Sequence, residues 1–302
     1  MNSLITIFTP TYNRAHTIHR VWESLKKQTY KHFEWVIVDD GSSDDIDIVM
    51  SAFINDADFP IIYHKFNSNR GKHRAINKGL SLCSGEFFII ADSDDAFTHD
   101  ALEFFINSWN NIPKNEKNSF SGIRACCNDQ FGNRVSDYLS IEPLDATMAD
   151  VFYIHKFRKE SWCMVQTSMH RKYLFPEDHN DHFYPEGIIW DKISRDKKFR
   201  FYNKAVRIYY VDASETSISN GNVKRKEKIS RNLEMSNYML NYQIDYFKFS
   251  PISFIKGASI YSFYAFIDNS YLTQFRNLNN LKAKLLFLLC SPLGLILSII
   301  KN

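Results

Sequence analysis

Several common sequence signatures are missing from this chain, and each absence removes a class of protein. Neither the G-x-G-x-x-G fingerprint of dinucleotide-binding folds nor the G-x-x-x-x-G-K-[ST] phosphate loop is present, which argues against an NAD or FAD site and against P-loop chemistry. The net charge is only +3 over 302 residues, so the charge balance gives no reason to expect nucleic acid as a partner. The five cysteines are odd in number and lack metal-ligand spacing, as expected of reduced thiols in the cytosol.

Long hydrophobic runs are also scarce. At the N-terminus, Leu4–Phe8 is a short, largely apolar run without a basic lead-in, so we expect no signal peptide. Near the C-terminus, Leu285–Ile300 is uncharged over 16 residues, which corresponds to about 24 Å of helix and falls short of the roughly 20 residues that cross a bilayer. Because Pro292 and Gly294 lie within this run, the sequence predicts an interfacial or re-entrant anchor rather than a clean span.

The first hundred residues contain a regular alternation of strand-like and helix-like segments. Apolar residues at helical spacing, such as Ile18, Val21 and Leu25, lie between successive strand candidates. This alternation predicts βαβ units, and therefore an α/β fold with a doubly wound, mostly parallel sheet and flanking helices. The strand candidates are Leu4–Thr9, Glu34–Val38, Ile61–Phe66 and Phe87–Ala91.

The remainder of the chain is less regular. Its strand candidates are Phe120–Cys127, Trp162–Met169 and Ala205–Val211, and from Val223 onward the pattern is helical and increasingly apolar. We therefore expect one domain over residues 1–215, composed of the halves 1–110 and 111–215, followed by a helical appendage over residues 216–302.

An acidic segment, Asp92-Ser93-Asp94-Asp95, directly follows the apolar run Phe87–Ala91. Ligands of open α/β sheets bind at the carboxyl ends of such strands. Three carboxylates in one place repel one another unless a positive charge lies among them. A divalent cation carrying a polyphosphate would supply that charge, since Mg²⁺ typically binds one or two carboxylates plus phosphates. The alternative is an acidic loop in which Asp95 or Thr98 caps the next helix.

The other strand candidates of the first half also end in polar residues. Because the carboxyl ends of parallel strands meet at one edge, the segments Thr9–Arg14, Asp39–Ser42 and Asn69–Lys72 are expected near the acidic segment. A nucleotide suits this edge: Asp40 can accept the imide N–H of uracil, and Arg70 or Lys72 can meet phosphate. Taken alone, Asp39-Asp40 favours a turn that caps a helix, and only together with the other strand ends does it favour the nucleotide.

Together these segments resemble the family-2 glycosyltransferases, which have a GT-A type fold. The matching residues are Thr9-Pro10-Thr11-Tyr12-Asn13-Arg14, Val38-Asp39-Asp40-Gly41-Ser42-Ser43-Asp44, Asn69-Arg70-Gly71 through Ala75 to Asn77-Lys78-Gly79, and Gly85-Glu86 to Asp92-Ser93-Asp94-Asp95. Four ordered motifs over about a hundred residues make a specific signal.

The resemblance implies an inverting transfer from a nucleotide-sugar donor, with Mg²⁺ or Mn²⁺ as cofactor.

 A UDP-sugar is the expected donor, bound by residues 1–110, while residues 111–215 would bind the acceptor. On this match Thr9 and Asp40 would contact the base, Asp92 would lie near the ribose, and Asp94 would bind the metal. The expected donor contacts are Thr9, Tyr12, Asn13, Arg14, Asp39, Asp40, Lys72, Asp92 and Ser93, and the expected metal ligands are Asp94 and Asp92.

An inverting transfer also needs a general base for the acceptor hydroxyl. The family usually supplies it from a Glu-Asp pair at a helix start, and the segment Tyr184–Asp191 is the candidate here. Trp190 stands where Glu is common, so Asp191 is the expected base and Glu186 the second candidate. We expect Asp191→Asn to abolish transfer and preserve donor binding. The alternative is that Asp191 only pairs with Arg195 on a solvated helix face.

Two further features concern the acceptor. His179 and His182 could form a metal pair, but a polar loop near the acceptor is the favoured interpretation, and the absence of a Q-x-x-R-W motif argues against a processive synthase. The basic cluster Lys224-Arg225-Lys226, Lys228 and Arg231, together with an apolar tail that lacks Asp and Glu after residue 269, indicates peripheral contact with anionic lipid.

These features predict an enzyme of surface-glycan synthesis on the cytoplasmic face of a bacterial membrane. Its acceptor would be a glycan or a polyprenyl-diphosphate-linked glycan. Two other classes remain open: a nucleotidyltransferase that makes a nucleotide sugar, and a non-catalytic protein that has kept the GT-A fold. The first would need a Gly-rich triphosphate loop, whereas Thr9–Arg14 contains no glycine.

Overall fold

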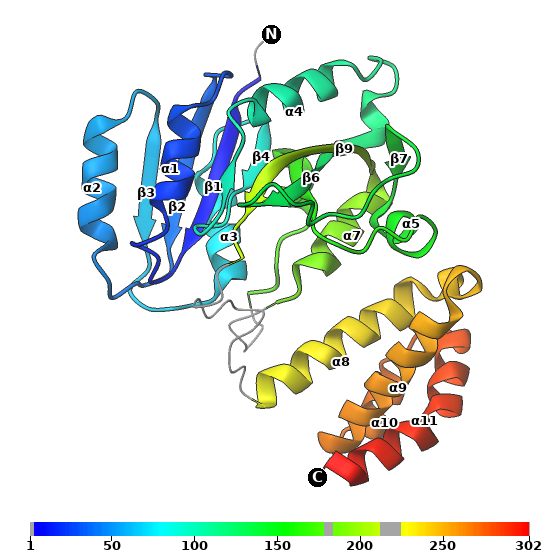
Figure 1. The fold of residues 1–302 in the computed structure, drawn as a ribbon. Coiled ribbons are helices and arrows are strands. Elements are labelled where there is room, and N and C mark those ends of the chain that lie inside the picture. Colours follow the sequence, from blue (N-terminus) through cyan, green and yellow to red (C-terminus); the bar gives the residue numbers. More distant parts are fainter. Residues whose placement is uncertain (1–2, 178–183, 212–224, 302) are drawn as a thin grey trace. The chain divides into compact units, whose positions relative to one another are not determined.

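The computed structural model describes residues 3–177, 184–211 and 225–301, which form two compact units (Figure 1). The first unit comprises Met1–Val151 and Phe157–Ala213, and the second comprises Phe152–Lys156 and Ser214–Asn302. The sheet and the acidic segment belong to the first unit, and the apolar C-terminal helices belong to the second.

Four parallel strands form one half of the sheet in the first unit. They are β1 (Ile5–Thr11), β2 (Phe33–Asp39), β3 (Ile61–Lys65) and β4 (Phe87–Ile90), in the spatial order β3-β2-β1-β4. The helices α1 (His19–Lys26), α2 (Ile46–Asp56) and α3 (Lys72–Leu82) connect them. β1, β2 and β4 are buried along their whole length, which explains their largely apolar sequences. The predicted βαβ alternation is confirmed.

The other half of the sheet is mixed. β8 (Trp162–Gln166) pairs antiparallel with both β4 and β6 (Phe120–Asp129), and β9 (Lys198–Tyr209) lies parallel to β6. The short strands β5 (Ala96–Phe97) and β7 (Leu144–Ala146) pair antiparallel with β9. The remaining elements of this unit are α4 (Ala101–Asn110), η1 (Lys117–Ser119), α5 (Met148–Tyr153, which reaches the unit boundary), α6 (Thr167–Lys172) and α7 (Glu186–Asp196).

Two predicted strand boundaries in this half were wrong by three residues or more. β9 begins at Lys198 rather than Ala205, because residues 198–204 alternate between buried and exposed positions and therefore lack an apolar run. β8 ends at Gln166, and the predicted continuation to Met169 instead forms the first turn of α6.

Aromatic side chains fill much of the core of the first unit. Trp22 of α1 stacks on Phe53 of α2, with ring centroids 4.7 Å apart, and the Trp162 indole N–H donates to the Ile90 carbonyl at 2.6 Å. A Cβ at Gly79 would lie 2.2 Å from the Phe8 ring, so α3 packs against β1 only because residue 79 has no side chain. This motif glycine therefore serves packing.

His170 of α6 gives the fold a dependence on pH. It is fully buried beside the rings of Phe88 and Trp190, and burial lowers its pKa from 6.5 to about 4. Between about pH 4 and pH 6.5, His170 therefore binds a proton in the unfolded chain but not in the folded one. The corresponding stability, about 3 kcal/mol, is present above pH 6.5 and is lost as the pH falls toward 4.

Urea unfolding of the wild type and of His170→Phe, compared from neutral pH down to about pH 4, tests this expectation. The variant should lose part of the pH dependence because Phe has no proton to bind. Equal slopes for the two proteins would contradict the assignment to His170.

The second unit consists of helices. They are α8 (Arg225–Tyr242), η2 (Ile244–Phe249), α9 (Pro251–Ile267), α10 (Tyr271–Arg276) and α11 (Leu281–Lys301). The expected interruption at Pro292 and Gly294 was wrong, since α11 continues through both. α11 also begins four residues before the uncharged run, and it is long and apolar enough to cross a membrane by length and composition.

Candidate active site

The polar ends of β1, β2 and β4 meet the starts of α3 and α7 and the end of β9 at one edge of the sheet. Arg14, after β1, has Nη2 4.0 Å from Asp94 Oδ2, after β4. Asn13 donates its backbone N–H to Ser42 Oγ, after β2, at 2.8 Å. The convergence expected from the sequence is therefore present in the structure. The side chains at this edge then divide into those that hold the loops in place and those that face outward.

The two aspartates after β2 hold loops. Asp39 is fully buried and accepts hydrogen bonds from the backbone N–H of Ser42 at 2.9 Å and from the Tyr63 hydroxyl at 3.1 Å. Asp40 accepts the backbone N–H groups of Arg70 and Gly71, at 2.7 and 2.8 Å. The turn that was weighed as an alternative for Asp39 is present, and Asp40 fixes the loop that precedes α3.

The expected donor contacts on β1 differ in exposure. Thr9 is fully buried, and its hydroxyl accepts the Trp35 indole N–H at 2.9 Å. Tyr12 is 45% exposed, while Asn13 and Arg14 are half-buried. The residues that follow β1 are therefore the ones accessible to a ligand, and Thr9 supports the strand beneath them.

A buried arginine lies among the three carboxylates after β4. Arg207 of β9 donates from Nε to Asp95 Oδ2 at 2.7 Å and from Nη2 to Asp92 Oδ2 at 2.8 Å, and Nη2 also pairs with Asp95. The guanidinium therefore supplies positive charge that the sequence analysis assigned to a metal. Sequence reasoning missed Arg207, although an arginine inside the strand-like run Ala205–Val211 is a signal that a carboxylate partner lies nearby.

The alternative role of Asp95 as a helix cap was wrong. Its second oxygen, Oδ1, accepts the backbone N–H of Tyr210 at 3.2 Å, so both oxygens bind the end of β9. The residue at the N-cap position of α4 is Asp100, whose own side chain makes no capping hydrogen bond, and Gln28 Oε1 accepts the backbone N–H of Leu102 in the first turn at 3.1 Å. Asp95 therefore joins β4 to β9 and is not directed at the following helix.

Lys72, the first residue of α3, connects the acidic segment with α7. Its Nζ lies 2.6 Å from Asp92 Oδ1 and 2.8 Å from Glu186 Oε1. Burial alone would lower the pKa of Lys72, but the two carboxylates outweigh it and raise the pKa. Burial alone would likewise raise the pKa of Asp92, and the charges of Lys72 and Arg207 instead lower it to about 2. Lys72, Asp92 and Glu186 thus form one ionic group.

Asp94 is the carboxylate of this segment that faces outward. Its side chain is 34% exposed, with Oδ2 4.0 Å from Arg14 Nη2, and its backbone carbonyl accepts a hydrogen bond from Arg20 Nη1 at 2.8 Å. Burial and then the negative charge of Asp92 raise the pKa of Asp94. A cation bound here would offset that repulsion, which keeps Asp94 a candidate metal ligand, but the described residues contain no cluster of three or more His, Cys, Asp or Glu side chains that could hold a metal ion. Asp92 does not fit the role of metal ligand in this structure, because its oxygens accept hydrogen bonds from Lys72 and Arg207.

The two candidate bases lie in different environments on α7. Glu186 opens the helix and is 29% exposed beside Lys72. Asp191 is five residues further on, which places it about 7.5 Å along the axis. It is buried and pairs with Arg195 Nε at 2.8 Å. The pairing with Arg195 exists, but on a buried face and not on a solvated one, and the structure brings only Glu186 into the ionic group.

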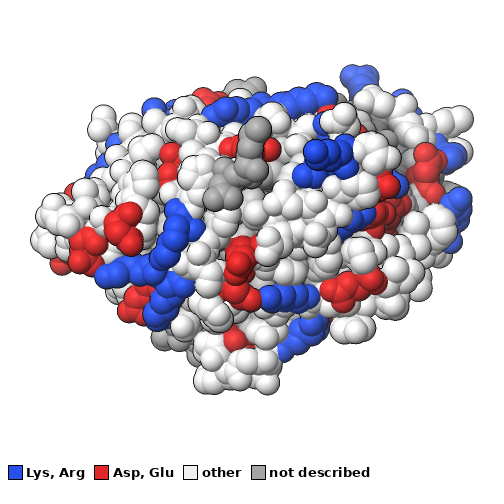
Figure 2. Space-filling view, turned by 90° about the horizontal axis from the view of Figure 1, so that it is seen from above, with Lys and Arg blue, Asp and Glu red and all other residues white. Residues whose placement is uncertain are grey.

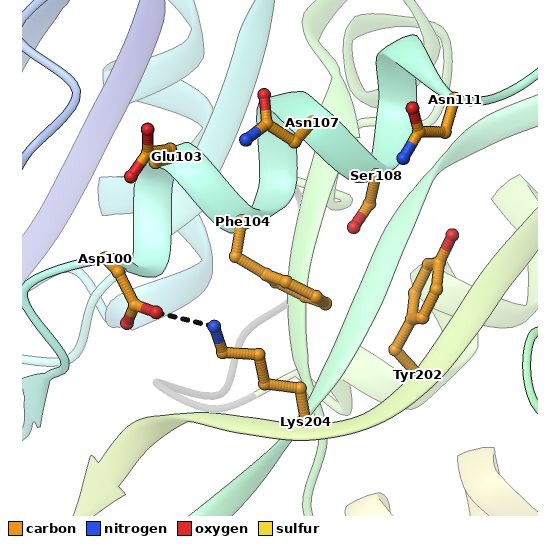
Figure 3. A pocket seen from close by; sticks show the side chains of 8 residues that line it. All are labelled: Asp100, Glu103, Phe104, Asn107, Ser108, Asn111, Tyr202 and Lys204. Atoms are coloured by element: carbon orange, nitrogen blue, oxygen red, sulfur yellow. Dashed lines mark hydrogen bonds and ion pairs between the residues drawn. The ribbon is translucent and has the colours of Figure 1, made fainter.

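His179, His182 and Lys224 fall outside the described residues, and Ser93 is buried. A hollow of about 320 Å³ lies between α4 and β9, where Lys204 Nζ is 2.5 Å from Asp100 Oδ2, and no strand-end candidate lines it (Figure 3). On the face drawn in Figure 2, acidic and basic side chains of the described residues are interspersed.

Comparison with known proteins defines the class. The family described as "Glycosyl transferase family 2" matches residues 6–174, which is more than half of the chain. The chain therefore belongs to this family. Among solved structures, residues 1–349 of TarS from S. aureus, in complex with UDP-GlcNAc, give a TM-score of 0.62 at 18% identity, covering 95% of this chain and 79% of that one. The GT-A type fold expected from the sequence is confirmed.

Two curated relatives come from bacterial glycan synthesis. The GalNAc(5)-diNAcBac-PP-undecaprenol beta-1,3-glucosyltransferase of Campylobacter jejuni is 26% identical over 210 residues, which cover 68% of this chain and 64% of that protein. The UDP-Glc:alpha-D-GlcNAc-diphosphoundecaprenol beta-1,3-glucosyltransferase WfgD of Escherichia coli is 34% identical over 111 residues, 36% of this chain and 43% of that protein. The matched segments thus span less than two-thirds of either relative.

Proposed function

We propose that the protein is an inverting glycosyltransferase that moves one sugar from a UDP-sugar to a hydroxyl of a lipid-linked glycan. The observation that carries the proposal is the ionic group of Lys72, Asp92 and Glu186 beside the outward-facing Asp94. It supports the proposal because a cation suited to phosphate, a carboxylate suited to a metal and a candidate general base lie at one sheet edge, in a chain that belongs to glycosyl transferase family 2.

In the proposed donor complex, the segment Tyr12–Arg14 and the loop fixed by Asp40 line the nucleotide. Lys72 and Arg14 supply positive charge to the diphosphate. Asp94 would hold Mg²⁺ or Mn²⁺, which when bound would neutralise charge on the departing diphosphate. Asp92, held on two sides by Lys72 and Arg207, would face the ribose from a fixed position.

Glu186 is the favoured general base in this proposal. An inverting transfer requires a carboxylate that takes the proton from the acceptor oxygen as that oxygen attacks the anomeric carbon. Glu186 is partly exposed next to the proposed diphosphate contact Lys72, whereas Asp191 is buried against Arg195. The order of the two candidates is therefore the reverse of the order expected from the sequence.

The acceptor and the location are proposed from the relatives and from the second unit. The names of the Campylobacter and Escherichia relatives describe transfer to undecaprenol-diphosphate-linked glycans. The apolar helix α11 would keep this protein at the cytoplasmic face of the membrane, where such acceptors are built. We propose no nucleic acid partner.

A panel of nucleotide sugars tests the donor site. Thermal unfolding should shift upward with a UDP-sugar, and more strongly when Mn²⁺ is present. Asp94→Asn should remove the increment due to Mn²⁺, whereas Asp56→Asn, an exposed aspartate of α2, should retain it. Stabilisation by a nucleoside triphosphate with release of pyrophosphate from a sugar phosphate would instead indicate a nucleotidyltransferase. No shift with any nucleotide sugar would indicate a non-catalytic protein.

A further inference from the structure

The helices α9 and α11 bury mostly small and polar residues, together with the aromatic residues Phe254, Tyr261 and Phe287, and expose large aliphatic ones. This is the reverse of the pattern in a water-soluble helix, which buries its aliphatic face. The residues of α9 that are buried include Gly257, Ala258, Ser259, Ser262 and Ala265. Those of α11 include Ala283, Cys290, Ser291, Gly294 and Ser298.

The two helices approach closely through these small residues. A Cβ at Gly294 of α11 would lie 2.1 Å from Ser262 Oγ and 2.8 Å from the backbone nitrogen of Phe263 in α9. Replacing Gly294 by any other residue would push the helices apart. Contact through glycine and serine is typical of helices that pack against each other within lipid, where backbones come close without large side chains between them.

The buried hydroxyl groups need no water. Ser259 donates to the Ile255 carbonyl at 2.8 Å, Ser291 to the Phe287 carbonyl at 2.7 Å, and Ser298 to the Leu295 carbonyl at 2.7 Å. Each bond lies within its own helix. The hydroxyl groups of this interface therefore have hydrogen-bond acceptors within the protein, as hydrocarbon surroundings require.

The outer faces are aliphatic over both helices. No charged residue lies between Leu285 and Ile300, and Lys256 is the one charged residue of α9. Water-soluble proteins rarely leave so many large apolar side chains exposed together. The exposed ones are Ile252, Ile255 and Ile260 on α9 and Leu285, Leu288, Leu289, Leu293, Leu295, Ile296, Leu297, Ile299 and Ile300 on α11.

We propose that α9 and α11 enter the bilayer together, as a helix pair whose aliphatic outer face contacts the lipid chains. The sequence predicts one lipid-contacting segment, and the burial pattern adds a second, α9. At 17 and 21 residues the helices are about 25 and 32 Å long, long enough to reach deep into a hydrocarbon core of about 30 Å. The inference deepens the membrane contact on which the proposed function depends.

The charges beside the pair favour lipid over a protein partner. No Asp or Glu follows Asp268, whereas Arg276, Lys282 and Lys284 lie at the end of α10 and the start of α11, where Lys282 also pairs with Asp245 at 2.7 Å. Basic side chains at the end of an apolar helix bind anionic headgroups while the helix enters the apolar layer. A second copy of this chain would bring the same positive charges, which repel one another.

Flotation of the full chain with vesicles of phosphatidylethanolamine and phosphatidylglycerol tests the pair. We expect the wild type to float with the vesicles and to remain bound in high salt, because insertion into hydrocarbon is not screened. Ile260→Glu on α9 and Leu289→Glu on α11 should each lower the bound fraction several-fold. Ile54→Glu is a matched control on α2, at 46% exposure compared with 41% for Ile260, and should float as the wild type does.

Several outcomes would overturn the proposal. Release by salt would indicate surface attraction only, and normal flotation of Ile260→Glu would leave α11 as a single anchor. A lipid-free dimer that Ile260→Glu dissociates would show that a second copy covers the face. Circular dichroism and the donor-dependent thermal shift check that each variant is folded. Because flotation requires no sugar transfer, this proposal and the proposed function fail separately.

Discussion

Glu186→Gln is expected to lower the rate of sugar transfer by about 10²–10⁴-fold, the usual contribution of a general base. Glutamine has nearly the same shape but cannot accept the proton of the acceptor hydroxyl. Donor binding should persist, since Lys72 keeps Asp92 as a partner when the charge of Glu186 is lost. The measurement is transfer from the donor found by the thermal-shift panel, with donor affinity determined in parallel.

Asp191→Asn is the matched comparison on the same helix. Because Asp191 is buried and paired with Arg195, we expect this variant to lose stability, while the folded fraction retains transfer. Full activity in Glu186→Gln, together with an inactive but stably folded Asp191→Asn, would restore the order expected from the sequence. The two variants therefore decide between the candidate bases.

Arg207→Met is expected to destabilise the first unit by about 3–5 kcal/mol, the usual cost of removing one partner of a buried ion pair. Methionine fills much of the space but leaves Asp92 and Asp95 without the guanidinium. Arg207→Lys should recover part of the lost stability, because an ammonium restores the positive charge but does not reproduce the guanidinium's separate N–H donors to Asp92 and Asp95. Urea unfolding at neutral pH measures these differences.

Lys204→Met on the same strand is the control for Arg207. Its ion pair with Asp100 is solvent-exposed, so the expected cost is below about 1 kcal/mol. An equal, small loss at both positions would show that the carboxylates find another counter-charge and that Arg207 is not needed among them. A large loss at Arg207 alone would support its role as the fixed cation of the site.

The sequence predicted the first half of the sheet because that information is local. β1, β2 and β4 are buried apolar runs, and the helices between them have apolar residues at helical spacing. β9 was predicted only in part, since Lys198–Lys204 alternates and belongs to a mixed region of the sheet. Strand partners in that region depend on pairing across the fold, which no local pattern records.

The candidate site was predicted as a set of strand ends, but its pairings were not. The segment Asp92–Asp95 marked the location, whereas its counter-charge, Arg207, lies on a strand whose register the sequence does not specify. Asp191 is buried because its face of α7 packs inward, and Glu186 joins the ionic group through its ion pair with Lys72. Sequence spacing alone does not determine such contacts between distant elements.

The distance along the chain between the acidic segment and Arg207 has a consequence for synthesis. Asp95 and Asp92 are 112 and 115 residues ahead of the arginine that neutralises them. A ribosome adds about 5–20 residues per second, so the carboxylates are made roughly 5–25 seconds before their counter-charge. Lys72 and Arg14, which are made earlier, offset part of their repulsion, but until Arg207 is made Asp95 lacks its ion-pair partner and the remaining repulsion opposes closure of this sheet edge. The edge that carries the proposed chemistry should consequently be among the last parts of the first unit to form on the ribosome.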